Sequence, residues 1–162
     1  MKIEPTSLAQ AKNFAYKLLS YREHSTKELE DKLIRKGFEK EVSSKVINAL
    51  KSLKLLDDWR FAKAFAENRI KYKPSGLALI RSELRSKGVD REAIDSIISD
   101  IKKNYNEYEV AYNIASNKAK RFNKISSIKA KQRLYDYLLR RRFDKDVIYD
   151  VLNAVFKDTN ST

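Results

Sequence analysis

The feature that most constrains the fold is a pattern of residues that occurs three times along the chain. It begins as STKELEDKLIRKGFEKEVSSKVINAL at residues 25–50, and it returns at residues 79–101 and 132–155. Successive copies are 51 and 54 residues apart. A nearly fixed period of this size is typical of stacked supersecondary units, so the chain is predicted to fold as a tandem array.

Apolar residues occupy the same positions in all three copies. When the copies are aligned on Phe38, Val89 and Phe143, a leucine or isoleucine stands nine and five positions earlier in each. Residues four apart share one face of a helix, and a second run with helical spacing follows each anchor. Each copy therefore predicts two helices joined at a corner. In the first copy their apolar faces comprise Leu29, Leu33, Val42, Val46, Ile47 and Leu50.

A further apolar helix face precedes each copy. The first is formed by Phe14, Ala15, Leu18 and Leu19, and comparable faces precede the other two copies. The structural unit is therefore three helices, and about nine are expected. The predicted fold class is all-α, with three tandem three-helix repeats forming an elongated, curved array. The expected domains are residues 7–56, 57–104 and 105–157.

Capping residues predict where the helices begin and end. Ser25 and Glu28 form a capping box, S-x-x-E, at the start of the second helix. Gly37 is expected to adopt the left-handed conformation that ends this helix. Asp57 or Asp58 is expected to cap the fourth helix, which ends near residue 73 because Pro74 follows. The other helices are expected at residues 7–22, 39–53, 77–87, 90–103, 107–122, 127–141 and 145–156.

An acidic residue directly follows each anchor. These are Glu39, Asp90 and Asp144, and each is expected to cap the helix after it. The polar stretch 103–108 breaks the pattern and is predicted to be a joint before the third repeat. Residues 1–6 are expected to be frayed, and residues 157–162 to be disordered.

The composition narrows the class of protein. Three glycines and two prolines in 162 residues favour long helices over a turn-rich β fold. The chain has no cysteine, which excludes disulfides and suits a reducing cytoplasm. No secretory signal is seen at the start, and no apolar run approaches ~18 residues, so no membrane partner is expected.

The charge points to a polyanionic partner. The chain carries a formal net charge of +13, and basic residues outnumber acidic ones by 12 to 7, 11 to 8 and 12 to 7 in residues 1–56, 57–104 and 105–162. Every repeat contributes, so a basic surface is expected along the whole array. Such a surface favours association with polyanions through electrostatic steering and counterion release.

The third repeat holds the strongest basic stretch. Between Lys118 and Arg142 ten basic residues face one acid, Asp136. The plain interpretation is a solvated helix face without a partner. The functional interpretation is a contact for a polyanion or an acidic protein, and the shortage of compensating carboxylates favours it. Within this stretch Lys129, Arg133 and Arg140 are expected near one line of a helix.

Basic residues also recur two positions before each anchor, at Lys36, Lys87 and Arg141. A cation at a helix C-terminus suits the helix dipole, so this recurrence is explained either by structure or by a shared binding ridge. The complete candidate binding surface is Lys32, Arg35, Lys36, Arg81, Arg85, Lys87, Lys118, Arg121, Lys129, Arg133, Arg140 and Arg141.

Enzymatic signatures are not found in the sequence, and no cofactor is expected. Three scattered glycines cannot build a phosphate loop, and one histidine without cysteine does not support a metal site. His24 is interpreted as a surface or staple residue beside the cap. Trp59 is expected to pack against the neighbouring repeat, and the alternative is a platform on which a nucleic-acid base stacks.

Three groups of motifs, in this order, resemble the bacterial regulatory protein RecX family. They are Tyr21–Ser25 with Glu28, Leu29, Lys32, Leu33 and Lys36–Phe38; Leu56–Asp58 with Arg60–Ala62; and Gly76, Ile80, Glu83, Leu84 and Lys87–Val89. The resemblance covers residues 8–157. It is looser in the third repeat, where Arg142 stands in place of Gly37 and Gly88.

The resemblance implies a non-enzymatic modulator of the RecA recombinase, acting in homologous recombination, DNA repair and the SOS response. Family members are similar three-helix repeat arrays that lodge in the groove of the RecA filament on DNA. The expected partners are the RecA filament and single- and double-stranded DNA, and the chain is expected to be a cytoplasmic monomer. The family motifs here are mainly structural, so the binding residues above rest on charge.

A second hypothesis is a DNA-binding protein that acts without RecA. A three-helix unit with a basic helix also resembles helix-turn-helix modules. Three tandem units without long linkers suit a continuous surface better than separate groove readers. A protein that binds only DNA should show a steep salt dependence and no requirement for RecA.

Overall fold

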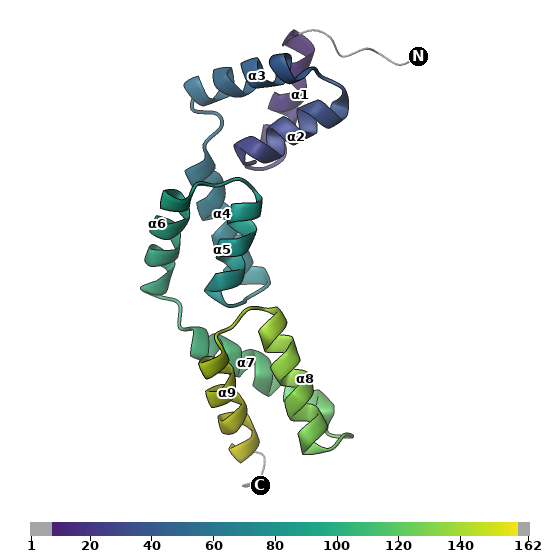
Figure 1. Ribbon diagram of the computed structural model, residues 1–162, viewed down its shortest axis with the longest axis vertical. Coiled ribbons are helices and arrows are strands. Elements are labelled where there is room, and N and C mark those ends of the chain that lie inside the picture. Colours follow the sequence, from purple (N-terminus) through teal and green to yellow (C-terminus); the bar gives the residue numbers. More distant parts are fainter. Residues whose placement is uncertain (1–7, 159–162) are drawn as a thin grey trace. The chain divides into compact units, whose positions relative to one another are not determined.

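The computed structural model describes residues 8–158, which contain nine α-helices, one 3-10 helix and no strand (Figure 1). The expected all-α class with three three-helix repeats is therefore confirmed. The expectations for residues 1–6 and for the last four residues lie outside the described part. The helices are α1 (Leu8–Tyr21), α2 (Thr26–Lys36), α3 (Lys40–Ser52), α4 (Asp58–Tyr72), α5 (Leu77–Ser86), α6 (Arg91–Lys102), α7 (Glu107–Ala119), η1 (Lys120–Phe122), α8 (Ser127–Arg140) and α9 (Lys145–Asp158).

The described residues form two compact units. The first comprises the chain up to Ala66 together with Leu84–Ile97, and the second comprises Glu67–Glu83 together with the chain from Ile98 onward. Helices α4, α5 and α6 each contribute to both units.

The first unit is built on a core between α1, α2 and α3 (Figure 1). Ala11 and Ala15 bring α1 close to its neighbours because their side chains are small, and both are fully buried. Leu29 and Leu33 from α2 and Val46 from α3 are also fully buried. The helical period predicted Ala15 and the three residues of α2 and α3, whereas Ala11 was not predicted; Phe14, Leu18 and Leu19, which were also predicted, are partly buried against this core.

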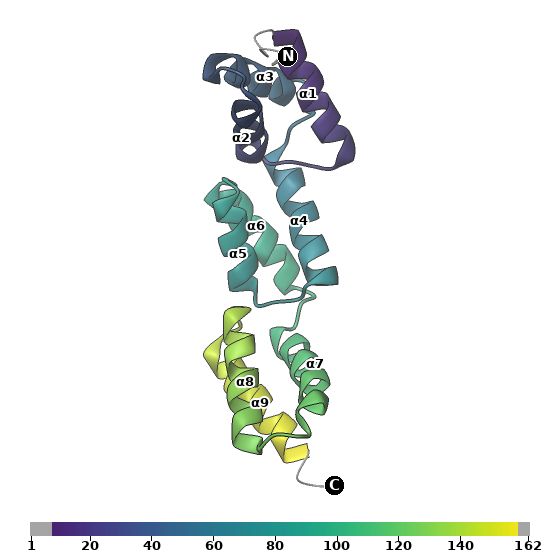
Figure 2. The ribbon, with the colours of Figure 1, turned by 90° about the vertical axis from the view of Figure 1, so that its right-hand side faces the viewer.

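The second unit has an equivalent core between α7, α8 and α9 (Figure 2). Ala111 and Ala115 on α7 repeat the two small residues of α1, and Leu134 and Leu138 on α8 repeat the two leucines of α2; all four are fully buried. The anchor residues Phe38, Val89 and Phe143 are buried as well.

All three corners use the left-handed region of the backbone. Gly37 has a φ of 102°, Gly88 has 79°, and Arg142 has 54°. The amide of Gly37 donates to the carbonyl of Ile34, and this bond closes the end of α2. The prediction for Gly37 is confirmed. The third corner has the same conformation although arginine is disfavoured there.

The caps agree with expectation in part. Ser25 Oγ accepts the amide of Glu28, and Asp57 is the acid that caps α4 by accepting the amides of Trp59 and Arg60. Asp90 and Asp144 accept amides at the starts of α6 and α9. Glu39 makes no such bond, so that expected cap is wrong; its longer side chain does not return to the amides as aspartate does.

Helix bounds differ from expectation mainly around α7 and α9. Helix α7 ends at Ala119, and residues 120–122 tighten into the 3-10 helix η1. Helix α9 continues through Lys157 to Asp158, so the expected disorder at these two residues is wrong. No helix in the described range 8–158 is long and apolar enough to cross a membrane.

A pair of hydrogen bonds recurs where one repeat follows another. In the first unit, Ser25 Oγ donates to the carbonyl of Lys87 at 2.7 Å, and the amide of Thr26 donates to Asp58 at 2.6 Å. In the second unit, the amide of Gly76 donates to the carbonyl of Arg141 at 3.0 Å, and the amide of Leu77 donates to Glu107 at 2.6 Å. In both units, the carbonyl at the corner of one repeat thus accepts a hydrogen bond from the start of the second helix in the preceding repeat.

The segment that was expected to be a joint takes part in this contact. Tyr105 donates its hydroxyl hydrogen to the carbonyl of Ser75 at 2.8 Å, two residues before the Glu107 bond. Burial raises the pKa of the Tyr105 phenol, although its hydrogen bond to Ser75 opposes this shift. Residues 105 and 107 are therefore anchored to residues 75 and 77.

Two single residues differ in how far they are exposed, and one of them contradicts its prediction. His24 is not a surface residue: only 2% of it is exposed, and its ring nitrogens lie 3.0 Å from the carbonyl oxygen of Arg22 and 3.2 Å from Lys32 Nζ. Burial lowers the pKa of His24, and the charges of Arg22 and Lys32 lower it further. Trp59 is 48% exposed, and its packing against the neighbouring repeat stays a prediction.

Candidate polyanion-binding surface

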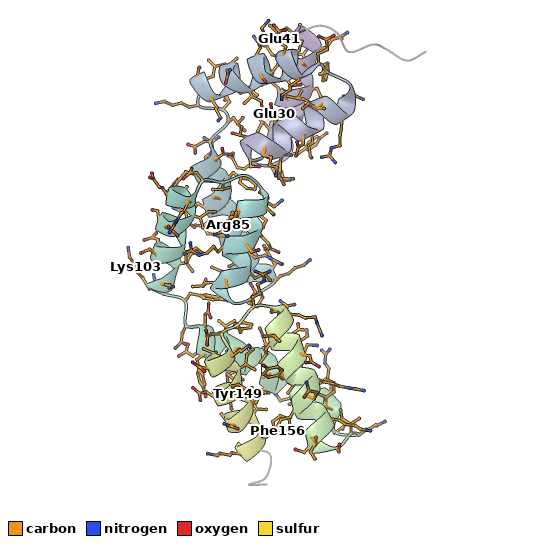
Figure 3. All side chains as sticks on the ribbon, in the orientation of Figure 1. Glu30, Glu41, Arg85, Lys103, Tyr149 and Phe156 are labelled. Carbon is orange, nitrogen blue, oxygen red and sulfur yellow. The ribbon has the colours of Figure 1, made fainter. Side chains whose placement is uncertain are left out.

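The basic surface of the third repeat is built on α7, η1 and α8. Asn106 caps α7 by accepting the amides of Tyr108 and Glu109, and Ser126 caps α8 by accepting the amide of Lys129. The leucines on one face of α8 are buried in the core. The opposite face of the helix, which carries basic side chains, is therefore exposed to solvent. Figure 3 shows nitrogen-tipped side chains projecting from α8.

Three of the predicted basic residues meet at one pocket. Lys118, Arg133 and Arg140 line a cavity of about 240 Å³ with Asp136, and Phe122 and Tyr137 complete its wall. Arg133 and Arg140 are exposed, and Lys118 is half-buried. The pocket therefore combines three cations, one acid and two aromatic rings.

The aromatic rings contact two of the three cations of this pocket. Lys118 Nζ lies 4.0 Å from the centroid of the Tyr137 ring, and the Arg133 guanidinium carbon lies 5.8 Å from that of Phe122. A cation over a ring face is attracted by the ring quadrupole and keeps its charge available to an anion. Asp136 accepts a hydrogen bond from Gln132 at 3.0 Å. The pocket thus presents ordered positive charge.

The other basic residues of this stretch are distributed around the pocket. Arg121 and Lys129 are exposed but do not line it. Lys131 lies 5.6 Å from the Phe156 ring and lines a separate groove with Tyr149 on α9 (Figure 3).

Arg141 has a structural role in the second unit. Its guanidinium donates to the carbonyl of Pro74 at 2.7 Å and lies 5.0 Å from the Tyr137 ring. Its own carbonyl accepts the amide of Gly76. The side chain is therefore engaged within the protein, which favours the structural interpretation for this member of the recurring cations.

Lys87 is engaged in the same way in the first unit. Its ammonium forms an ion pair with Glu28 and lies 5.4 Å from the Phe65 ring. Burial raises the pKa of Glu28, but hydrogen bonds from Lys87 and Arg22 outweigh burial, and the net pKa lies below its ordinary value. Lys36 differs, because it is exposed and lies 5.7 Å from the Phe14 ring. The three recurring cations thus differ in how far they are engaged within the protein.

The remaining predicted residues lie on α2 and α5. Lys32 is half-buried beside His24, and Arg35 is exposed with its Nε donating to the carbonyl of Asp31 at 3.2 Å. Arg81 is half-buried and Arg85 is exposed. None of these four lines the pocket of the third repeat.

Sequence reasoning did not assign the two aromatic residues of the pocket. Arg133, Tyr137 and Arg140 lie at spacings of four and three residues, so the helical period could have placed this tyrosine between the arginines. Phe122 had no such signal, because it follows α7 in the 3-10 turn. In the described chain no group of three or more His, Asp or Glu side chains is arranged to hold a metal ion.

Comparisons with known proteins agree with the three-repeat architecture. Family models of the first, second and third three-helix domains of RecX match residues 11–50, 57–97 and 105–152. A regulatory protein RecX from Prosthecochloris aestuarii is 38% identical over 90% of this chain and 93% of its own length. One from Mycolicibacterium smegmatis is 32% identical over 90% of this chain and 79% of its own length.

Solved structures are similar in fold. The crystal structure of RecX from Lactobacillus salivarius has a TM-score of 0.73 and 23% identity, and it covers 91% of this chain and 96% of the other. A second crystal structure, of a regulatory protein RecX, has a TM-score of 0.76 and 21% identity, and it covers 90% of this chain and 71% of the other.

Proposed function

Because the chain belongs to the RecX family of regulatory proteins, we propose that it is a non-enzymatic inhibitor of the RecA recombinase. It binds in the groove of the RecA–DNA filament, where it limits filament extension and so lowers ATP hydrolysis and strand exchange. Its proposed state is a cytoplasmic monomer with repeats at residues 7–56, 57–104 and 105–157.

The observation that carries this proposal is the pocket of the third repeat. Lys118, Arg133 and Arg140 converge there beside two aromatic rings. Such a site suits a phosphate backbone or an acidic side chain, and both are present in a nucleoprotein filament. The net charge of +13 adds long-range attraction to the same partner.

Inhibition of RecA ATP hydrolysis on single-stranded DNA tests this proposal. We expect substoichiometric protein to slow hydrolysis, because filament growth can be stopped at few points. The variant with both Arg133→Glu and Arg140→Glu should lose the inhibition. Arg141 is left unchanged in this variant, because its contact with Pro74 belongs to the fold.

A matched control has the same change of charge at other sites. Lys40→Glu with Arg91→Glu alters two exposed residues at the first positions of α3 and α6, where an acid suits the helix dipole. This control should inhibit like the unmodified protein. Equal loss in both double variants would show that net charge acts without a defined site, and no inhibition by the unmodified protein would overturn the proposal.

Direct DNA binding without RecA is the alternative function, since the same pocket suits a phosphate backbone. In that case excess single-stranded DNA abolishes the inhibition, because the protein then competes with RecA for the strand. Inhibition that persists with excess DNA supports binding to the filament. Salt dependence of DNA binding by the protein alone measures how many phosphates it neutralises.

A further inference from the structure

The basic surface described above does not include Trp59, which is the only tryptophan in the chain. It lies in the first turn of α4, and 48% of it is exposed. About half of a large aromatic side chain is thus accessible, and covering it with a ligand is favourable. Lys63, one turn later, places its Nζ 5.5 Å from the centroid of the indole ring.

The backbone that presents Trp59 is held rigidly. Arg60 donates to the carbonyls of Lys54 and Leu55 at 3.3 and 3.2 Å, and its Nε donates to Glu23 at 2.6 Å. Asp57 accepts the amide of Trp59 at 2.8 Å. The turn before α4 is therefore fixed from both sides, so little conformational freedom is lost when the exposed ring binds a ligand.

Exposed lysines flank Trp59 in the chain. The amide of Lys54 donates to the carbonyl of Lys51, and Arg60, next to Trp59, donates to the carbonyl of Lys54; both lysines are exposed, as is Lys63. The acids that the structure places beside this turn are engaged in the fold: Asp57 caps α4, Asp58 accepts the amide of Thr26, and Glu23 is paired with Arg60. This segment thus offers a partner three ammonium groups and one indole, in addition to the exposed side chains of Leu53 and Leu55.

We infer that Trp59, with Lys51, Lys54 and Lys63, forms a contact for single-stranded nucleic acid in which a base stacks on the indole ring. Single-strand binding sites combine cations for the backbone with aromatic rings for the bases, and stacking tolerates any sequence. This contact goes beyond the proposed function, because it lies outside the basic surface of the third repeat and acts in the free protein.

Charge complementarity favours a nucleic acid over a protein as the occupant. Leu53 and Leu55 are also exposed and would suit an apolar protein segment. The three lysines, however, would have to be matched by acids on a protein partner, whereas every nucleotide of a polynucleotide supplies one phosphate. Aliphatic side chains are compatible with a nucleic acid as well, because they can contact sugars and base faces.

The fluorescence of this single tryptophan tests the inference. The protein is titrated with an oligothymidine and, separately, with an abasic oligonucleotide of equal length and charge, while the anisotropy of labelled strands measures binding. We expect oligothymidine to quench Trp59 and the abasic strand to bind without comparable quenching. Trp59→Leu should weaken oligothymidine binding about 5- to 150-fold, as expected for the loss of one stacked base.

Two variants complete the design. Trp59→Phe should retain most of the affinity because it keeps an aromatic face. Tyr21→Leu should leave affinity unchanged, because it removes an even more exposed ring of the first unit that is not part of the proposed contact. Circular dichroism verifies that each variant keeps its helices.

Three outcomes would overturn the inference. Equal quenching by both strands would show that phosphate approaches without stacking, and DNA binding without quenching would place the strand elsewhere. Quenching that appears only when RecA is added would assign the surface to a protein. The RecA assay with the Arg133 and Arg140 variant is a separate readout, so either proposal can fail alone.

Discussion

The carboxylate of Glu107 accepts the backbone amide of Leu77, with 2.6 Å between oxygen and nitrogen. Glu107 is the first residue of α7 and Leu77 the first of α5. The same relationship joins Asp58, the first residue of α4, to Thr26, the first of α2. An acid at the start of one repeat thus caps the second helix of the repeat before it.

Removing this acid should weaken the second unit. Glu107→Ala leaves the Leu77 amide without its acceptor, and we expect the free energy of unfolding to fall by about 1–2 kcal/mol. Urea denaturation followed by circular dichroism measures the change. Glu109→Ala is the control, since it removes an exposed acid from the same helix turn. Equal losses in the two variants would assign the effect to the helix dipole alone.

A second prediction concerns Gly76, which lies against the third corner. An added Cβ would stand 2.0 Å from the carbonyl oxygen of Arg142, and backbone atoms cannot move away as a flexible side chain can. Gly76→Ala should therefore destabilise the protein by several kcal/mol, of the order of ~3 kcal/mol or more. Thermal unfolding measures this loss of stability, with Gly37→Ala as the comparison. The Gly37 variant places a side chain on a left-handed backbone, which should destabilise the protein by about 1–2 kcal/mol. A milder effect at Gly76 than at Gly37 would contradict the close approach.

The strained third corner predicts a stabilising change. Arg142 has a φ of 54°, where a side chain is disfavoured, so Arg142→Gly should raise the free energy of unfolding by up to ~1 kcal/mol. Arg142→Ala removes the same charge but keeps a Cβ, so the difference between the two variants isolates the backbone effect. Chemical denaturation should rank the glycine variant above the alanine variant, and the reverse order would refute the prediction.

The buried His24 predicts a loss of stability in mild acid. Its pKa lies below the ordinary 6.5 because burial, Arg22 and Lys32 disfavour the charged ring. A group with a lowered folded pKa contributes stability that is fully present above 6.5 and is lost as the pH falls through the folded value. The melting temperature should therefore decline from pH 7 into this range, and His24→Gln should flatten that decline.

Glu28 separates this effect from general acid unfolding. Its pKa is also lowered on balance, although burial opposes the shift, so its contribution is lost only below the ordinary carboxylate value of 4.5. Glu28→Gln should therefore change the melting profile below that pH and leave the histidine step in place. A single step that both variants remove would show that the two groups titrate as one.

The repeated helices could be predicted from the sequence because they depend on local spacing. Leu29 and Leu33, like Leu134 and Leu138, are one helical turn apart, and this spacing is enough to bury them together. Gly37 likewise marked a corner, since glycine enters the left-handed region without steric cost. The basic stretch that includes Arg133 and Arg140 was visible because charge is a property of composition.

Other features depend on contacts between residues far apart in the chain, so they could not be predicted from local patterns. The engagement of Lys87 with Glu28 and the contact of Arg141 with Pro74 both arise where consecutive repeats meet. The sequence by itself determined the helices, their apolar faces and the total charge. The tertiary structure decided which cations remain accessible to a partner. Some of them make contacts between repeats within the protein, and others remain exposed to solvent.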